Sequence, residues 1–198
     1  MPTFMEIVKS RRSIRRFRPD PLEREKVLEC LEAARLAPSA SNVQPWRFVV
    51  VDRPDLKDRL AREAFSGVYK VSMFAAQAPV IVVVLARPDF VTNQIGRRLQ
   101  GTSFYLVDLG IAVEHLILRA EELGISTCWM GWFDTRKVRK VLAIPRKYKV
   151  TALVPMGYAA SRPPRESPRK AMAEIAWFNG VETSAEAGDG AGATAPGS

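Results

Sequence analysis

Short, nearly continuous apolar runs alternate with segments of helical periodicity, and this alternation constrains the fold more than any other feature. The apolar runs are typical of strands buried on both faces, and they cover residues 48–51, 79–85, 125–130 and 150–156. The clearest helical period lies between them, from Leu106 to Ala120, and Gly124 closes it. The pattern therefore predicts a sheet covered by helices on both faces, and taken alone it favours a parallel sheet.

Capping and proline signals predict where the other helices begin and end. Thr3 followed by Glu6 forms a capping box for a first helix that ends near Arg12. A second helix stops at Pro38, and a third opens at Pro54. Asp134 is placed to cap a further helix.

Length and composition bound the class of protein. The chain has 198 residues, two Cys and one His, which fits one domain and excludes a zinc framework or a disulfide-rich secreted scaffold. No apolar run is long enough to span a bilayer, and the N-terminus lacks the layout of a signal peptide. We therefore expect a soluble, cytoplasmic protein with one domain over residues 1–180. Residues 181–198 are rich in Gly, Ala, Ser and Thr, which predicts a disordered tail.

The net charge of +9 is unevenly distributed. The last 18 residues hold three acids and no bases, so the preceding residues carry 30 bases against 18 acids, or +12. Bases gather at residues 9–18, 136–149 and 162–170. Such clusters attract phosphate, whether in nucleic acid, an anionic membrane or a phosphorylated small molecule.

The familiar catalytic motifs are absent from the sequence. It contains no nucleophile elbow, phosphate-binding P-loop, dinucleotide fingerprint or HExxH zinc motif. His115 falls on the polar side of its helical period, which favours a structural role over a catalytic one. Cys30 and Cys128 have no evident His partner and are interpreted as buried fillers. Any demanding chemistry is therefore expected to belong to a cofactor.

Three segments are candidates for a ligand site. Alternation places Arg11, Ser13 and Arg15 on one side of an extended segment, suited to phosphate, although the segment taken alone favours a solvated basic run or a nonspecific nucleic-acid arm. Residues 37–46 crowd Ser, Asn and Gln side chains that suit the edge of a heteroaromatic ring, although ordinary turn chemistry explains part of this string. Gly131 lies where a strand gives way to a helix, so backbone N–H groups there can face a ligand.

Two further features concern aromatic residues and the C-terminus. Trp129 and Trp132 flank Gly131 and could shape a flat pocket or simply be core or dimer contacts. Residues 159–170 are rich in Pro and Arg, and residues 175–178 are apolar again. An arm ending in an apolar strand predicts docking on a distant surface, such as that of another subunit.

Four motifs in register resemble the FMN-dependent nitroreductase family. They are RRSIRRF (11–17), APSASNVQPWRFVVV (37–51), DLGIAVEHLILRAEELGISTCWMGWF (108–133) and VPMGYAASRPPRESPRK (154–170) followed by EIAWF (174–178). The resemblance covers residues 4–178 and implies an α+β fold with a central, mainly antiparallel sheet flanked by helices. It also implies an intertwined homodimer that exchanges C-terminal strands and holds FMN at the subunit interface. The implied reaction passes hydride from NAD(P)H through flavin N5 to a nitroaromatic, quinone or flavin by ping-pong kinetics.

The resemblance assigns site residues by matching positions. Positions matching phosphate contacts are Arg11, Arg12 and Ser13, with Arg169 and Lys170 closing on the phosphate later in the chain. Arg15 matches a basic position beside the flavin pyrimidine. The loop offered by the partner subunit matches Pro38, Ser39, Ala40, Asn42 and Gln44. The backbone N–H groups of Gly131 and Trp132 match those that approach N5, and no catalytic side chain or metal is implied.

Departures from the family pattern leave alternatives open. Val71 and Phe74 stand where larger bacterial nitroreductases place Asn and Lys, and a bulky Trp132 narrows the site. Residues 87–100 are short and lack the Glu, Tyr and Lys set of flavin-dependent dehalogenases. The alternatives are a specialised oxidation, dehalogenation or flavin-fragmenting enzyme of the same fold and, ranked lower, a basic nucleic-acid-binding protein without enzymatic activity.

Overall fold

The computed structural model describes residues 2–87, 101–162 and 167–181. The chain divides into two compact units, Met1–Pro163 and Pro164–Ser198, and each is described by itself. The predicted tail from residue 182 onward and the predicted short segment at residues 88–100 lie outside the described residues.

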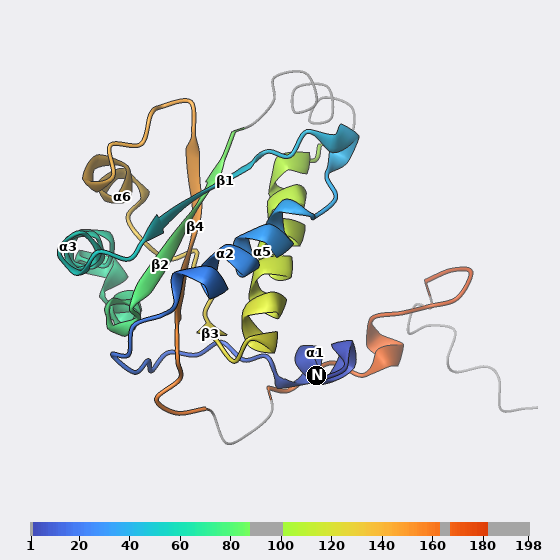
Figure 1. Cartoon of the computed structure of the whole chain (residues 1–198). Helices are drawn as coiled ribbons and strands as arrows, with labels where there is room; N and C mark the ends of the chain where they lie inside the picture. Colours follow the sequence, from blue (N-terminus) through green and yellow to red (C-terminus); the bar gives the residue numbers. More distant parts are fainter. Residues whose placement is uncertain (1, 88–100, 163–166, 182–198) are drawn as a thin grey trace, which may run out of the picture. The chain divides into compact units, whose positions relative to one another are not determined.

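A four-stranded antiparallel sheet forms the centre of the first unit (Figure 1). Its order is β1 (Trp46–Val51), β2 (Val80–Ala86), β4 (Lys149–Gly157) and β3 (Ser126–Thr127), and each neighbouring pair is antiparallel. The antiparallel sheet implied by the family resemblance is therefore confirmed, and the parallel sheet favoured by the apolar pattern is wrong. An apolar run reports burial on both faces, which β2 shows along its whole length, but it carries no information on strand direction.

Helices cover both faces of the sheet (Figure 1). Val82 and Val84 face one core, shared with α2 (Arg24–Arg35) and α5 (Phe104–Glu122). Ile81 and Val83 face the other core, shared with α3 (Pro54–Ala64) and α6 (Thr135–Val141). Full burial of such a side chain stabilises the fold by about 1.5–3 kcal/mol. Because successive side chains of β2 point to opposite faces of the sheet, this one strand packs against both helical layers.

The predicted helix caps are present. The Thr3 side chain accepts from Glu6 N–H and the Glu6 carboxylate accepts from Thr3 N–H, which opens α1 (Phe4–Ser10). Asp134 accepts from the N–H groups of Arg136 and Lys137 at the start of α6. The helix α1 ends at Ser10, two residues before the predicted end.

Two 3₁₀ segments, η1 (Ala40–Asn42) and η2 (Gly67–Gln77), complete the connections that matter for the site. The predicted strand at 125–130 is shorter than expected, because only Ser126–Thr127 forms a ladder and Met130 returns as a single bridge to Leu153. Between these pairs, Cys128 N–H still donates to the Pro155 carbonyl of β4 at 3.4 Å, so this part of the chain stays at the edge of the sheet without forming a regular ladder.

The second unit contains η3 (Met172–Glu174), and the strand predicted at 175–178 is not formed there. The N–H groups of Ile175 and Ala176 both donate to the Met172 carbonyl, and Phe178 is 96% exposed. A strand needs a neighbouring edge to satisfy its backbone groups, and the edge predicted for this one belongs to a second copy of the chain.

Candidate functional site

A pocket of about 260 Å³ brings two of the three candidate segments together. It lies between the N-terminal extended segment, η2 and the chain that follows β3. Its lining comprises Arg15, Val71, Ser72, Phe74, Cys128, Trp129, Met130, Gly131 and Trp132. The predicted basic position, the predicted backbone donors and the two departures from the family pattern thus share one cavity.

The extended segment at residues 11–17 reaches the pocket because backbone hydrogen bonds attach it to the edge of the sheet. Ile14 N–H donates to the Thr127 carbonyl at 2.9 Å, and Ser13 pairs with Thr127 as a parallel bridge. Ile14 is buried, so alternation turns Arg15 the other way. The Arg15 guanidinium carbon lies 5.9 Å from the centre of the Phe74 ring. The basic side chain therefore rests against one pocket wall.

The chain around Gly131 presents unpaired backbone donors. Met130 N–H donates to the Leu153 carbonyl and Asp134 N–H to the Ala64 carbonyl, both at 2.9 Å, so both ends of the segment are fixed. Within the described parts of the chain, the N–H groups of Gly131 and Trp132 have no acceptor. A Cβ placed on Gly131 would meet no atom within 4 Å. Two adjacent donors therefore have no partner in the described chain, beside a Cα position with room for further atoms, and they suit a ligand atom that accepts hydrogen bonds.

Ser72 holds this segment in place and was not predicted from the sequence. Its hydroxyl is buried and donates to the Trp132 carbonyl at 2.9 Å. Nothing in the run around Ser72 distinguishes it from an ordinary loop serine, so no sequence signal could have identified it. This hydrogen bond directs the Trp132 carbonyl toward η2.

Trp132 forms an exposed aromatic rim rather than a core contact of this chain. The residue is 57% exposed, and its indole N–H donates to the Val68 carbonyl at 3.1 Å. The Tyr69 ring lies 5.2 Å away, centre to centre, at an interplanar angle of 56°. Trp129 is also exposed, at 42%. Flat apolar surface therefore borders the donors of the Gly131 segment.

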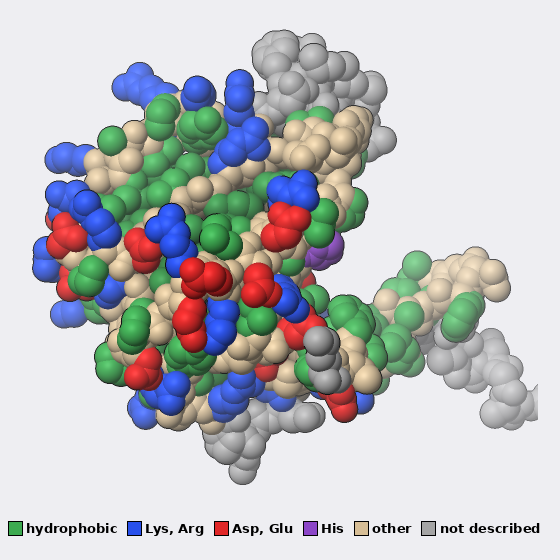
Figure 2. Space-filling view, in the orientation of Figure 1, with side chains coloured by type: hydrophobic (Ala, Val, Ile, Leu, Met, Phe, Trp, Pro, Cys, Tyr) green, Lys and Arg blue, Asp and Glu red, His purple; other side chains and the backbone are tan. Residues whose placement is uncertain are grey.

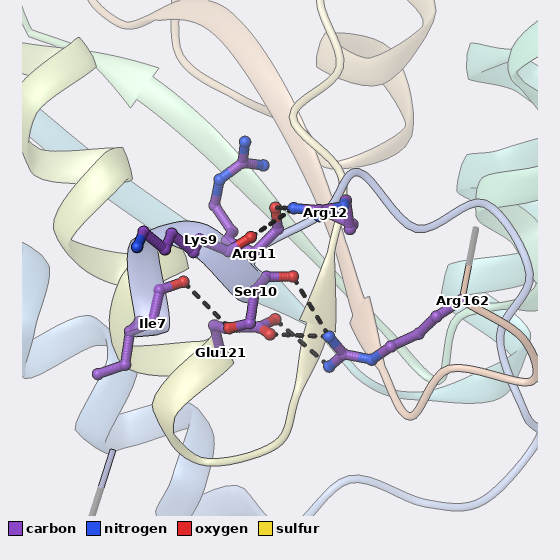
Figure 3. Close-up of polar contacts among 7 residues, drawn as sticks. All are labelled: Ile7, Lys9, Ser10, Arg11, Arg12, Glu121 and Arg162. Carbon is purple, nitrogen blue, oxygen red and sulfur yellow. Dashed lines mark hydrogen bonds and ion pairs between the residues drawn. The ribbon is translucent and has the colours of Figure 1, made fainter. Parts of the chain in front are cut away.

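The predicted phosphate contacts follow α1 directly. Arg11 lies 3.8 Å from the Glu114 carboxylate, and Figure 3 shows Arg12 turned back onto the carbonyls of Lys9 and Arg11. Beside them, the Arg162 guanidinium donates to Glu121 at 2.8 Å. The structure thus gathers basic side chains around residues 10–13, each held by carbonyls or carboxylates of α1 and α5.

The late basic residues Arg169 and Lys170 belong to the second unit. Arg169 donates to the carbonyls of Ser167 and Pro168. Their assignment to the phosphate remains a prediction.

The loop predicted to touch the flavin from the partner is strained and bonded to its own chain. Ser41, Asn42 and Gln44 have positive φ angles of 50°, 53° and 48°, a left-handed conformation that is unfavourable by about 1–2 kcal/mol per residue. Ala40 N–H donates to the buried Asp108 carboxylate at 3.0 Å, and Gln44 N–H donates to the Ser39 hydroxyl at 2.9 Å.

This loop does not line the pocket. It lies against the N-terminal end of α5, whereas α1 lies near the other end of that helix (Figure 1). Pro38, Ser39, Ala40, Asn42 and Gln44 are therefore not brought to Arg15 or Gly131 within one chain. Asp108, which anchors the loop, was missed, although an acid within an apolar helical run was a signal.

The remaining titratable candidates have structural surroundings. His115 Nδ1 lies 3.3 Å from the Ala33 carbonyl, which ties α5 to α2. Burial raises the pKa of the Cys30 thiol to about 12, and burial also raises the pKa of Cys128. Both thiols are therefore unreactive near neutral pH. The described residues contain no group of His, Cys, Asp and Glu that could hold a metal ion, and none of their helices could cross a membrane.

The chain belongs to the nitroreductase family, whose model matches residues 8–73 and 67–158. A protein named NADH dehydrogenase from Thermus thermophilus is 32% identical over 176 residues, covering 76% of this chain and 83% of that protein. The structure of an FMN-dependent nitroreductase from Clostridium difficile R20291 superposes with a TM-score of 0.71 at 26% identity, over 89% of this chain and 99% of that one. An iodotyrosine deiodinase from Thermotoga neapolitana is 24% identical over 185 residues, covering 83% and 93% of the two chains. The protein is thus an oxidoreductase of a family in which several relatives are named NAD(P)H or NADPH nitroreductases.

Proposed function

We propose that the protein is an FMN-dependent oxidoreductase that passes hydride from NAD(P)H, through flavin N5, to a small acceptor such as a nitroaromatic, quinone or flavin. The observation that carries this proposal is the pair of unpaired N–H groups at Gly131 and Trp132, which share one pocket with Arg15. FMN, when bound, supplies a ring atom that accepts and releases hydride.

The residues present fit this cofactor. The N–H groups of Gly131 and Trp132 match an acceptor such as N5, and the empty space beside Gly131 leaves room for a flat ring. Arg15 would stabilise negative charge on the N1–C2=O edge, while Arg11, Arg12 and Ser13 would hold the phosphate. In a homodimer with two FMN sites, the bases around the two phosphates would account for part of the +12 charge that residues 1–180 of each chain carry.

In this proposal, the residues of the pocket position the cofactor and select the substrate, and they do not transfer protons. The described pocket offers no carboxylate or imidazole among its lining residues, so this proposal requires no side-chain acid or base. Trp132 and Tyr69 border the opening with flat surface, against which nicotinamide and then the acceptor would stack in turn. Use of one place by two substrates in succession gives ping-pong kinetics.

A homodimer is part of the proposal. Exposed apolar side chains lie on α1 and α5, namely Phe4, Met5, Val8, Leu106, Val107 and Ile111. Groups of apolar residues on the surface mark protein interfaces. Such an interface would allow the loop at residues 38–44, together with Arg169 and Lys170, to complete the site of a neighbouring copy.

The visible absorbance of the purified protein, recorded before and after anaerobic addition of NADH or NADPH, tests the proposal. Yellow protein that either nucleotide bleaches is the expected result. Yellow protein that neither nucleotide bleaches would contradict the NAD(P)H reaction and favour a specialised oxidation, dehalogenation or flavin-fragmenting reaction. Colourless protein that FMN cannot reconstitute would overturn the cofactor site.

A further inference from the structure

A second cavity, of about 450 Å³, lies between α3 and α6 and is lined mostly by charged side chains. Arg59 and Glu63 come from α3, while Lys137, Lys140 and Val141 come from α6. Three bases against one acid give this groove a net charge of +2. Figure 2 shows Lys and Arg side chains gathered on the left of the molecule, where Figure 1 places these two helices. Its volume falls within the range of about 300–1,000 Å³ typical of small-molecule sites.

Two of the three bases in the groove are uncompensated. The Lys137 ammonium lies 3.5 Å from the Glu63 carboxylate and donates to the Ser66 hydroxyl at 2.8 Å. Arg59 and Lys140 are exposed, and neither has an ion-pair partner in the described parts of the chain. Unpaired like charges in one groove repel each other, and an anion between them would remove that repulsion.

The neighbouring base Arg139 has a structural role and serves as a comparison for Arg59 and Lys140. Its guanidinium donates to the carbonyls of Pro145 and Tyr148 at 2.9 and 2.7 Å and so binds the loop that follows α6. Arg59 and Lys140 hold no such loop, so the fold itself does not account for their presence in the groove.

The groove is connected to the pocket at Gly131 through one turn of chain. Lys137 binds the Ser66 hydroxyl, and the Trp132 indole binds the carbonyl of Val68. Because consecutive Cα atoms are 3.80 Å apart, the Cα atoms of Ser66 and Val68 are separated by at most about 7.6 Å. In a nicotinamide dinucleotide, a ribose, a pyrophosphate and a second ribose separate the nicotinamide from the adenine. This separation is longer than the distance between the Cα atoms of Ser66 and Val68.

We infer that the α3–α6 groove binds the 2′-phosphate of NADPH and makes the enzyme prefer NADPH to NADH. The inference rests on the proposed function, which requires a nicotinamide dinucleotide at the pocket. A phosphate monoester carries about −1.5 to −2 charges at pH 7, which matches the net charge of the groove, and NADH lacks this group. The guanidinium of Arg59 can hydrogen-bond phosphate in a bidentate manner or lie against the adenine ring.

Direct binding of two fragments to the FMN-loaded protein tests the inference. The probes are adenosine 2′,5′-bisphosphate and adenosine 5′-monophosphate, titrated by calorimetry at fixed ionic strength. The variant is Arg59→Gln/Lys140→Gln. The matched control is Arg146→Gln/Lys147→Gln, which removes the same charge from exposed residues outside the groove lining.

The bisphosphate should bind roughly tenfold more tightly than the monophosphate, and the groove variant should lose roughly that factor. The control variant should remain within about twofold of the parent protein, as expected for distant surface charge. In steady-state assays the kcat/KM ratio of NADPH to NADH should fall by about the same tenfold in the groove variant only.

Three outcomes would overturn the inference. The first is equal affinity for the two probes, and the second is an equal effect of the groove and control variants, which would indicate diffuse charge alone. The third is steeply salt-dependent binding of an oligonucleotide that the groove variant weakens, with no discrimination between the probes. Bleaching of the flavin by either nucleotide is scored separately: if neither bleaches it while the bisphosphate still binds in the groove, the proposed function fails and the phosphate site remains.

Discussion

The segment at residues 128–132 and the loop at residues 37–46 are assigned to the same flavin by resemblance, yet they differ in how they use their hydrogen bonds. In the first, the N–H groups of Gly131 and Trp132 are unpaired among described residues, and a Cβ at Gly131 would meet no atom within 4 Å. In the second, Ala40 N–H is paired with Asp108 and Gln44 N–H with Ser39. One segment leaves donors for a ligand, and the other fixes its own shape.

The backbone strain in the loop at residues 37–46 suggests why this loop fixes its own shape. Three non-glycine residues of the loop adopt left-handed backbone angles, which persist only where the surroundings impose them and which cluster at functional sites. None of the loop residues lines the pocket at Gly131. A shape held against strain and directed outward fits recognition of something on another chain. This difference supports the proposal that each chain carries two half-sites, which a homodimer would join.

The largest expected effect tests the open half-site. Gly131→Val places a branched side chain where the flavin ring is proposed to lie, so the variant should purify without FMN. Its free energy of unfolding should stay within about 0.5 kcal/mol of the parent, as for exposed positions away from special features, because a Cβ at Gly131 meets no atom of the chain. Absorbance near the flavin bands and chemical denaturation measure the two quantities.

Arg146→Val provides the control for this variant. Arg146 is exposed, lies in the loop after α6 and does not line the pocket. The control should keep its FMN and stay within about 0.5 kcal/mol of the parent in its free energy of unfolding. A Gly131→Val protein that retained full flavin would contradict the placement of the cofactor beside Gly131.

Mixed dimers test whether the two half-sites belong to different chains. Arg11→Ala removes a proposed phosphate contact, and FMN should bind roughly 10–100-fold more weakly, since hydrogen bonds to charged groups contribute about 1.5–3 kcal/mol. Asp108→Ala releases the loop at Ala40 and should also lower FMN retention. Each variant alone carries the defect in both sites of its symmetric dimer.

Co-expression of the two differently tagged variants separates the models. If each site joins Arg11 of one chain to the loop of the other, one site of the heterodimer is intact, and about half of the parent FMN content returns. If each site lies within one chain, both sites keep a defect and no flavin returns. The FMN content of the doubly purified heterodimer decides between these arrangements, and each variant co-expressed with its own tagged copy is the control.

The sequence predicts the scaffold well because its signals are local. The Thr3–Glu6 capping box and the Asp134 cap are confirmed, and each predicted apolar run contains a strand. Strand direction was not readable from the same runs, since a run such as residues 79–85 looks identical in a parallel or an antiparallel sheet. The antiparallel order was expected only from the family resemblance.

The candidate site was predictable in part for a similar reason. Arg15 and Gly131 stood out because an alternating basic segment and a strand-end glycine are local patterns, and the structure places both in one pocket. Ser72 and Asp108 act through partners 60 and 68 residues away in sequence, a distance over which no spacing rule operates. The strand expected at residues 175–178 is not formed in the single chain, and the edge proposed to pair with it lies on a second copy, so its formation stays a prediction.

A smaller effect concerns the anchor of the loop. Asp108 is 5% exposed and accepts from Ala40 N–H, so Asp108→Ala leaves that donor without its partner and should lower the free energy of unfolding by about 1–3 kcal/mol. Asp108→Asn keeps an oxygen acceptor and should recover most of the loss. Chemical denaturation of both variants measures this, and equal losses would show that the charge, rather than the hydrogen bond, holds the loop.

The smallest expected effect is a pH dependence of the hydrogen-bond network that links the start of α2 to Tyr158. Glu23, just before α2, accepts from Lys26 at 2.8 Å and from the Tyr158 hydroxyl at 2.6 Å, and Tyr158 also accepts Arg18 N–H of the pocket-side segment at its carbonyl. The hydrogen bond from Lys26, followed by that from Tyr158, lowers the pKa of Glu23 from 4.5 to about 2. A lowered pKa in the folded state means that the stabilisation is complete above pH 4.5 and is lost as the pH falls toward 2.

Thermal unfolding between pH 7 and pH 3 measures this loss through the fall in Tm. In Glu23→Gln the group no longer titrates, so the fall in Tm below about pH 4.5 should be shallower than in the parent. Glu25→Gln, two residues further along and within the first turn of α2, should follow the parent curve with only a constant offset, because no described partner holds Glu25. Because Glu23 is exposed, the difference in slope should be small. Parallel curves for the parent and Glu23→Gln would show that this network does not join α2, which leads into the strained loop, to the segment that carries Arg15.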